Sequence, residues 1–186
     1  MVLDIYDNVL ETDIAELIDT EMKKMTFKYD YNSTKGTVNK HWHTFCGSDT
    51  VKEEYSFINH IWDTAKLKYN FEKLYKVQKF KRVYCNAHTH GIEPHVHKDD
   101  GDFTMIYYPR LDWKPDWLGG TSIWNENKTE IVKYVNYIPN RLIVFDAKLP
   151  HQAMSVSRQC YELRTCIVFK TWRSDANANR LDFYKV

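Results

Sequence analysis

Histidines crowd one short segment of this chain. Four of the eight lie between His88 and His97, in the stretch AHTHGIEPHVHKDDGD, and His151 stands alone about fifty residues later. Side chains two residues apart on an extended strand share a face, so His97 and Asp99 can point toward one ion. A histidine from a facing strand would supply a third ligand. The spacing therefore predicts a metal site built from His97, Asp99 and His151.

The donor types narrow the choice of metal without settling it. Two imidazoles and one carboxylate leave three positions of an octahedral iron open, as in non-haem Fe(II) oxygenases, but zinc accepts the same donors. His95 and His97 also have the two-residue spacing, which leaves open an all-histidine site of the cupin type with His151. Cupins have a glycine well before such a pair and a glutamate soon after it, whereas Gly91 lies too close. We therefore favour Asp99 over His95.

Arg164 lies thirteen residues after His151, in the segment YELRTCIVFK. An arginine on an inward-facing strand can bind a carboxylate through its planar fork of N–H donors. A keto acid that chelates an iron at one end needs such a group for its far carboxylate. The sequence predicts that role for Arg164, against the alternative of an ordinary strand arginine that faces solvent.

The elements that would position these residues differ between the two ends of the chain. Apolar spacing predicts a helix from Thr12 or Asp13 to about Met25, and a second helix from about Val51 to Tyr69. From Val77 onward, short β-type runs alternate with turn signals. The predicted strands cover residues 80–87, 103–109, 121–126, 129–138, 141–146, 151–156 and 163–172. Such closely spaced strands favour antiparallel pairing in a sandwich or barrel, with the early helices on one outer face.

Composition sets the outer limits. The 186 residues are 43% hydrophobic and 15% aromatic, which is typical of one folded domain. A formal charge of +1 gives no general attraction to nucleic acid or to an anionic membrane. The four cysteines lack the spacing of a zinc knuckle or a disulfide framework. The chain shows neither a signal peptide nor an apolar run of about 20 residues that could cross a bilayer, so we expect a soluble, cytoplasmic protein.

Taken in order, the segments from about Tyr84 to Trp172 resemble one known family. They are the tyrosine strand RVYCNA, the HxD pair, the strand TMIYYP, the double glycine, the run PNRLIVFDAKLPH and the arginine strand LRTCIVFK. Together they resemble the Fe(II)- and 2-oxoglutarate-dependent dioxygenases, specifically the prolyl-4-hydroxylase-like branch. The resemblance implies a mainly β fold, a double-stranded β-helix or jelly roll, with N-terminal helices packed on one face. We expect a single domain over 1–186, in which 1–76 form a helical support region and 77–186 the jelly-roll core.

The resemblance also implies roles for single residues. The iron ligands would be His97, Asp99 and His151. Arg164 would bind the distal carboxylate of 2-oxoglutarate, Tyr108 would hydrogen-bond the same carboxylate, and Tyr84 would face the active site. The interval from the distal histidine to the arginine is longer than in close relatives, so Arg158 is a rival carboxylate ligand. The implied cofactors are Fe(II) and 2-oxoglutarate, with ascorbate as a further candidate.

The implied reaction is hydroxylation of an unactivated C–H bond with O2, releasing succinate and CO2. A prolyl residue or proline-like molecule is the leading substrate by family analogy. Two alternatives remain: a demethylase of alkylated nucleic-acid bases and a non-catalytic jelly-roll module that binds a metal or ligand. The first would use the basic run KLYKVQKFKR at 73–82, which we instead expect to be a solvated connection, so we favour a peptide or small-molecule substrate over nucleic acid.

Two further features of the sequence bear on the site. Trp113 and Trp117 lie in a loop that is either a flexible cover near the site or pinned to the barrel. His88, His90 and His95 are predicted to be loop residues near the mouth of the site, where they either support the metal ligands, contact the substrate or, as we favour, are simply solvated.

Overall fold

The computed structural model describes residues 2–33 and 38–174 and is mainly β. Its elements, in chain order, are β1 (Leu3–Tyr6), α1 (Thr12–Lys24), β2 (Lys28–Tyr31), β3 (His41–Ser48), β4 (Thr50–Val51), the 3-10 helix η1 (Glu53–Ile58), α2 (Asn59–Leu67), α3 (Phe71–Tyr75), β5 (Phe80–His88), β6 (Phe103–Tyr108), the 3-10 helix η2 (Pro115–Trp117), β7 (Thr121–Trp124), β8 (Ile131–Val135), β9 (Arg141–Asp146), β10 (His151–Ala153) and β11 (Arg164–Thr171).

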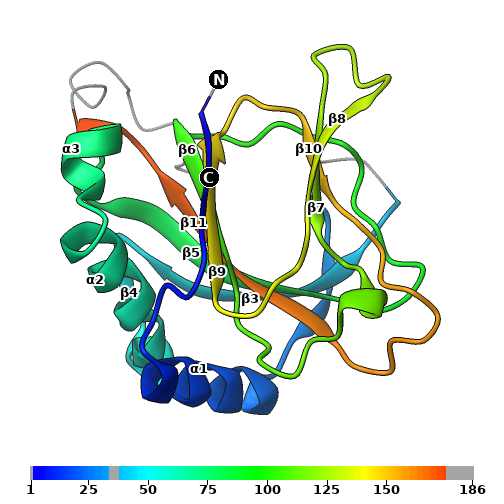
Figure 1. The fold of residues 1–186 in the computed structure, drawn as a ribbon, viewed down its shortest axis with the longest axis horizontal. Helices are drawn as coiled ribbons and strands as arrows, with labels where there is room; N and C mark the ends of the chain where they lie inside the picture. The colour runs from blue at the N-terminus through cyan, green and yellow to red at the C-terminus, as the bar shows by residue number, and fades with distance from the viewer. Residues whose placement is uncertain (1, 34–37, 175–186) are drawn as a thin grey trace.

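The strands form two antiparallel sheets. The large sheet has the order β1-β9-β6-β11-β5-β3-β2, with β4 paired to β3, and the small sheet has the order β10-β7-β8. In Figure 1 α2 and α3 lie on the left, α1 lies along the bottom, and β7, β8 and β10 lie on the right. The prediction of a mainly β fold with antiparallel strands and flanking helices is confirmed. The short β10 carries the distal histidine at its first position.

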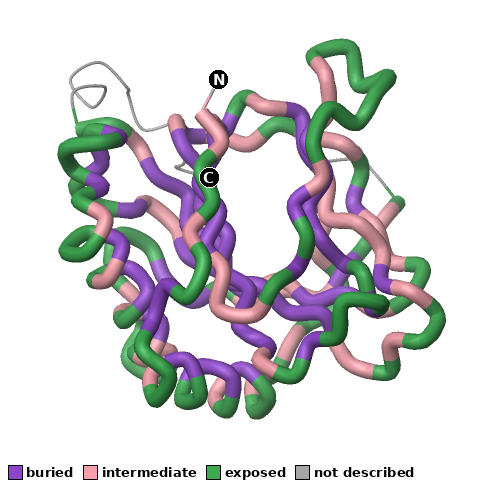
Figure 2. Tube along the Cα trace, in the orientation of Figure 1, coloured by how far each residue is buried: buried purple, intermediate pink, exposed green. Residues whose placement is uncertain are grey.

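The large sheet contributes residues to two apolar clusters. One cluster joins α1 and α2 to alternate residues of the sheet, among them Val83, Met105 and Phe169. The other fills the space between the two sheets with the intervening residues, among them Ile106 and Val168. This alternation follows from the two-residue period of a strand. In Figure 2 the central strands β6 and β11 of the large sheet are accordingly purple, whereas the edge strand β1 is pink and green.

The region 1–76, predicted to be a helical support, also builds part of the sheet, and the structure corrects that prediction. β1 pairs with β9 at one edge, and β3 pairs with β5 on the other side. Sequence periodicity misses β3 because its register shifts between Phe45 and Gly47, which breaks the alternation of inward and outward residues. Gly47 is required there, since a Cβ atom would lie 2.0 Å from the carbonyl oxygen of Thr50.

The helix predicted from Val51 to Tyr69 is also shorter than expected. Val51 belongs to β4, a 3-10 helix follows, and a kink at Tyr55 precedes α2. The first helix does begin at Thr12, but the residue before it makes no side-chain cap hydrogen bond. The seven strands predicted after residue 77 are all present as β5 to β11, with ends shifted by a few residues.

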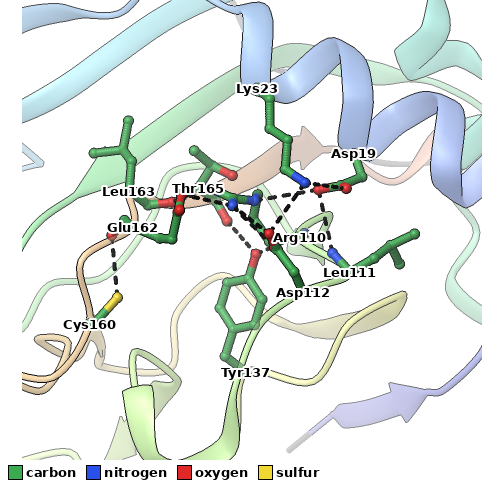
Figure 3. A network of polar contacts seen from close by, with 10 residues as sticks. All are labelled: Asp19, Lys23, Arg110, Leu111, Asp112, Tyr137, Cys160, Glu162, Leu163 and Thr165. Carbon is green, nitrogen blue, oxygen red and sulfur yellow. Dashed lines mark hydrogen bonds and ion pairs between the residues drawn. The ribbon is translucent and has the colours of Figure 1, made fainter.

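A polar network anchors the start of β11, where Arg164 stands. Arg110, only 4% exposed, bonds to Asp112 at 3.1 Å and Glu162 at 2.9 Å, and its Nε lies 3.4 Å from Asp19 of α1. The Tyr137 hydroxyl accepts from the backbone N–H of Arg110 at 3.2 Å and donates to the carbonyl of Thr165 at 2.9 Å. Figure 3 shows these groups converging from the first helix, the loop after β6, the segment between β8 and β9, and the chain around the start of β11. The network ties these distant segments of chain to the base of the site.

Candidate metal centre and adjoining pocket

Backbone pairing brings the two predicted histidine ligands together. His97 and His151 form an isolated antiparallel bridge, with N···O distances of 3.0 and 2.9 Å in the two directions. The N–H of Asp99 donates to the carbonyl of Ala147 at 2.8 Å, which keeps this segment against the turn before β10. The candidate ligand atoms of His97, Asp99 and His151 all lie within 4.8 Å of one another. The structure thus places the three residues predicted from the sequence in one cluster.

Both imidazoles are oriented for metal binding. The Nδ1 of His97 lies 2.7 Å from the carbonyl of His95, and the Nδ1 of His151 lies 2.8 Å from the carbonyl of Leu149. A carbonyl only accepts, so each Nδ1 carries the proton and each Nε2 keeps a lone pair. Burial, with the nearby His151, lowers the pKa of His97 to about 3, and burial lowers the pKa of His151 to about 4. Both rings are therefore neutral at pH 7, as a metal requires.

The Asp99 carboxylate completes the cluster. Its Oδ1 lies 3.6 Å from His97 Nε2, and its Oδ2 lies 3.1 Å from His151 Nε2. Oδ2 also accepts from the Thr104 hydroxyl at 2.6 Å and forms a close ion pair with the ammonium of Lys170. Lys170 is 2% exposed, and burial, reinforced by Arg82, lowers the pKa of its ammonium.

Sequence reasoning missed Lys170, although a signal for it exists. It stands six residues after Arg164 on the same strand, so the two-residue period places both side chains on the face that lines the site.

The all-histidine alternative is not favoured by this geometry. His95 is exposed, and it contributes its backbone carbonyl to His97 rather than its ring. The cluster of candidate ligands contains Asp99 in its place.

A cavity of about 280 Å³ opens beside the cluster. Its lining includes the three candidate ligands and, further in, Arg164, His88 and Thr121. The volume is just below the range of roughly 300 to 1,000 Å³ that is typical of small-molecule sites.

Arg164 is completely buried and lines this cavity. Its Nε donates closely to the carbonyl of Gly119, and its Nη1 lies 3.1 Å from His88 Nδ1. Its Nη2 has no hydrogen-bond partner among the described residues, and none of their carboxylates forms an ion pair with it. A buried cation without a counter-ion requires an anionic ligand. The rival Arg158 is exposed and does not line the cavity.

The two predicted tyrosines lie at different depths. Tyr84 is 8% exposed and lines the cavity, as expected of a residue that faces the site. Tyr108 is completely buried and lies behind the cavity wall, with its hydroxyl 2.7 Å from the hydroxyl of Thr121, which does line the cavity. Any contact of Tyr108 with a ligand would therefore pass through Thr121, and its direct role stays a prediction.

His88 is not a loop residue, and the structure corrects that prediction. It is the last residue of β5, is 1% exposed and stands opposite Arg164 in the strand register. His90 and His95 are exposed, as predicted for loop residues. The pairing of β5 with β11 determines the position of His88, and local sequence spacing does not report that pairing.

Trp113 and Trp117 pack into the core between the sheets. They are 6% and 3% exposed, their rings meet edge to face at 5.1 Å, and Trp113 stacks on Tyr137 at 4.5 Å. Of the two interpretations left open, the structure favours the loop that is pinned to the barrel.

Part of the basic run at 73–82 forms ion pairs with acidic residues. Lys79 and Lys81 both pair with Asp49, at 3.8 and 3.1 Å, and Arg82 pairs with Asp100 at 2.6 Å. Two carboxylates thus pair with three of the five basic residues of this run. Among the described residues, no helix is long and apolar enough to cross a membrane.

The arrangement fits a divalent metal that binds a carboxylate-bearing ligand. Two neutral imidazoles and a carboxylate are the facial donor set of non-haem iron sites, and they leave positions open for a chelating ligand and oxygen. The unpaired donor of Arg164 in the same cavity fits the far end of an anionic ligand.

Comparison with known proteins identifies solved structures with the same fold. No family model and no curated protein matches the chain. Among solved structures, a prolyl hydroxylase from Trichoplax adhaerens matches with a TM-score of 0.69 and 17% identity, over 96% of this chain and 87% of that chain. That structure is a complex with a hypoxia inducible factor oxygen degradation domain peptide fragment. A Pseudomonas putida prolyl-4-hydroxylase matches with a TM-score of 0.67 and 15% identity over 92% of each chain.

A viral collagen prolyl hydroxylase from Paramecium Bursaria Chlorella virus-1, in its 2OG complex, matches with a TM-score of 0.61 and 16% identity over 91% of this chain and 94% of that chain. The protein thus has the jelly-roll fold of the prolyl hydroxylases and 2OG-Fe(II) oxygenases, which confirms the predicted fold.

Proposed function

We propose that this protein is an Fe(II)- and 2-oxoglutarate-dependent dioxygenase that hydroxylates an unactivated C–H bond and releases succinate and CO2. The observation that carries the proposal is the set of residues that line one cavity. The cavity holds the cluster of His97, Asp99 and His151, together with a buried arginine whose Nη2 has no partner among the described residues. A metal site alone would not need that arginine.

The residues that line the cavity would have two separate roles. His97, Asp99 and His151 would hold the iron, which when bound with 2-oxoglutarate supplies oxygen activation coupled to decarboxylation of the keto acid. Arg164 would bind the distal carboxylate and so fix the orientation of the keto acid. Its rigid mounting supports this role, because Gly119 holds its Nε, and the rings of Tyr108 and Tyr137 lie 5.9 and 5.8 Å from the guanidinium.

We propose a prolyl residue in a peptide as the substrate. The solved structures with this fold include two prolyl hydroxylases and a collagen prolyl hydroxylase, and one of them holds a peptide fragment. The formal charge of +1 gives the alternative of alkylated nucleic acid no general electrostatic support. The need for ascorbate stays a prediction.

The direct test has two parts. Under anaerobic conditions, Fe(II) and 2-oxoglutarate should together give a visible charge-transfer band that neither gives alone. In air, succinate release should be stimulated by one class in a panel of proline-containing peptides, free amino acids and methylated oligonucleotides. Stimulation by peptides supports the prolyl proposal, and stimulation by oligonucleotides overturns it. Absence of the band in folded protein would favour a non-catalytic binding module.

Replacing Arg164 by leucine should weaken 2-oxoglutarate binding by roughly a hundredfold, because a charge-assisted contact in a buried site is lost. Iron affinity should change by less than about threefold, since the guanidinium makes no contact with the three ligands. Arg164→Lys, which keeps the charge but loses the fork, should fall between the two. Calorimetric titration measures both affinities, and equal loss of iron and keto acid would show that Arg164 is only structural.

A further inference from the structure

The two oxygens of the Asp99 carboxylate have different surroundings. Oδ2 accepts from the Thr104 hydroxyl at 2.6 Å and forms the close ion pair with the ammonium of Lys170. The same ammonium donates to the Thr104 hydroxyl at 3.2 Å, which leaves the hydrogen of that hydroxyl for Asp99. No donor of the described chain bonds to Oδ1, which lies 3.6 Å from the unprotonated Nε2 of His97. The carboxylate is therefore held through Oδ2 only.

The two donors are parts of the large sheet. Thr104 on β6 and Lys170 on β11 stand opposite each other in the strand register. Thr104 is completely buried, and the side chains of Lys170 and Asp99 are 3% and 9% exposed. The backbone pairing of β6 with β11 thus keeps both donors beside the same carboxylate oxygen.

These donors determine which carboxylate oxygen a metal can reach. Either oxygen lies near a ligand nitrogen, because Oδ1 is 3.6 Å from His97 Nε2 and Oδ2 is 3.1 Å from His151 Nε2. A carboxylate has about four lone-pair positions, two on each oxygen. Thr104 and Lys170 use those of Oδ2, whereas those of Oδ1 have no donor in the described chain. Oδ1 is therefore the oxygen that is free for the metal.

We infer that Lys170 and Thr104 are positioning residues that restrict Asp99 to binding the metal through Oδ1 alone. The inference rests on the proposed function and deepens it. Two imidazoles and one carboxylate oxygen fill three positions of an octahedral metal and leave three open, two for the keto acid and one for O2. A carboxylate that bound through both oxygens would fill the last of these. The two donors therefore keep a position open for O2.

Position 104 offers a matched pair of substitutions. Thr104→Val removes the hydroxyl and keeps a branched side chain of similar size. Thr104→Ser keeps the hydroxyl and removes a methyl group. Lys170→Met removes the other donor and keeps a long, unbranched side chain. Because Lys170→Met also removes a buried charge, the pair at position 104 decides the question if that variant does not fold.

Two measurements report the coordination without turnover. With Mn(II) alone, line broadening in the EPR spectrum in water enriched in a magnetic oxygen isotope counts the water molecules on the metal. With Fe(II) and 2-oxoglutarate under anaerobic conditions, nitric oxide takes the place of O2, and its binding is titrated through the EPR signal of the nitrosyl complex.

We expect Lys170→Met to hold one water fewer on Mn(II) than the wild type, because Oδ2 becomes available to the metal. It should bind nitric oxide at least about tenfold more weakly, as is typical when an outer partner of a metal ligand is lost. Thr104→Val should change both quantities in the same direction by a smaller amount, about threefold for nitric oxide. Thr104→Ser should match the wild type in both.

Three results would overturn the inference. If Lys170→Met and Thr104→Val keep the water count and the nitric oxide affinity of the wild type, the donors do not restrict Asp99, and the proposed function stands without them. If Thr104→Ser and Thr104→Val weaken nitric oxide equally, packing of the methyl group is responsible. If the wild type binds neither Mn(II) nor nitric oxide in the presence of Fe(II) and 2-oxoglutarate, the proposed function fails and the inference with it.

Discussion

The variant His151→Ala should lose Fe(II) affinity by more than about a hundredfold, which is the upper end of the range for substitutions outside the ligand shell. One of three protein ligands disappears, while the bridge to residue 97 is made by backbone atoms and remains. The same loss is expected for His97→Ala and for Asp99→Ala. The visible band with 2-oxoglutarate should vanish in all three variants. Competition with a coloured chelator under anaerobic conditions measures the affinity.

The chain supplies a matched control in His95. It lies two residues before His97, and its ring is exposed and absent from the cluster of candidate ligands. His95→Ala should therefore keep both the iron affinity and the band. The opposite pattern, in which His95→Ala loses the metal and Asp99→Ala keeps it, would show that the all-histidine site of the cupin type is the real one.

Those parts of the site that depend on local spacing were predictable from the sequence. His97 and Asp99 share a face because they are two residues apart on extended chain, and the strand order brings His151 opposite them. Arg164 opens a strand whose run of β-branched and aromatic residues is visible in the sequence.

The parts that depend on strand register could not be predicted. His88 meets Arg164 only because β5 and β11 pair with those two residues opposite each other. No periodicity within either strand reports this register. Likewise β3 carries a shift at Phe45 that hides its alternation, so a strand next to β5 was overlooked.

The second large expected effect is a loss of stability when Lys170 is replaced. Its ammonium forms a close ion pair with Asp99, and Asp99 and Lys170 both have side chains less than a tenth exposed. Thr104 is the other side-chain donor to the same carboxylate oxygen, at 2.6 Å. Removing one partner of a buried ion pair leaves the other charge uncompensated. Lys170→Met should therefore lower the free energy of unfolding by about 3 to 5 kcal/mol, measured by urea denaturation in the presence of a chelator.

A double variant isolates the charge from the loss of packing. Lys170→Met combined with Asp99→Asn removes both charges, so it should recover a large part of the lost stability, and the two substitutions should be strongly non-additive. Added Mn(II) should stabilise the single variant more than the wild type, because a divalent cation bound by Asp99 supplies the positive charge that methionine lacks. A loss below about 1 kcal/mol in the single variant would show instead that Thr104 alone satisfies the carboxylate and that Lys170 contributes no net stability.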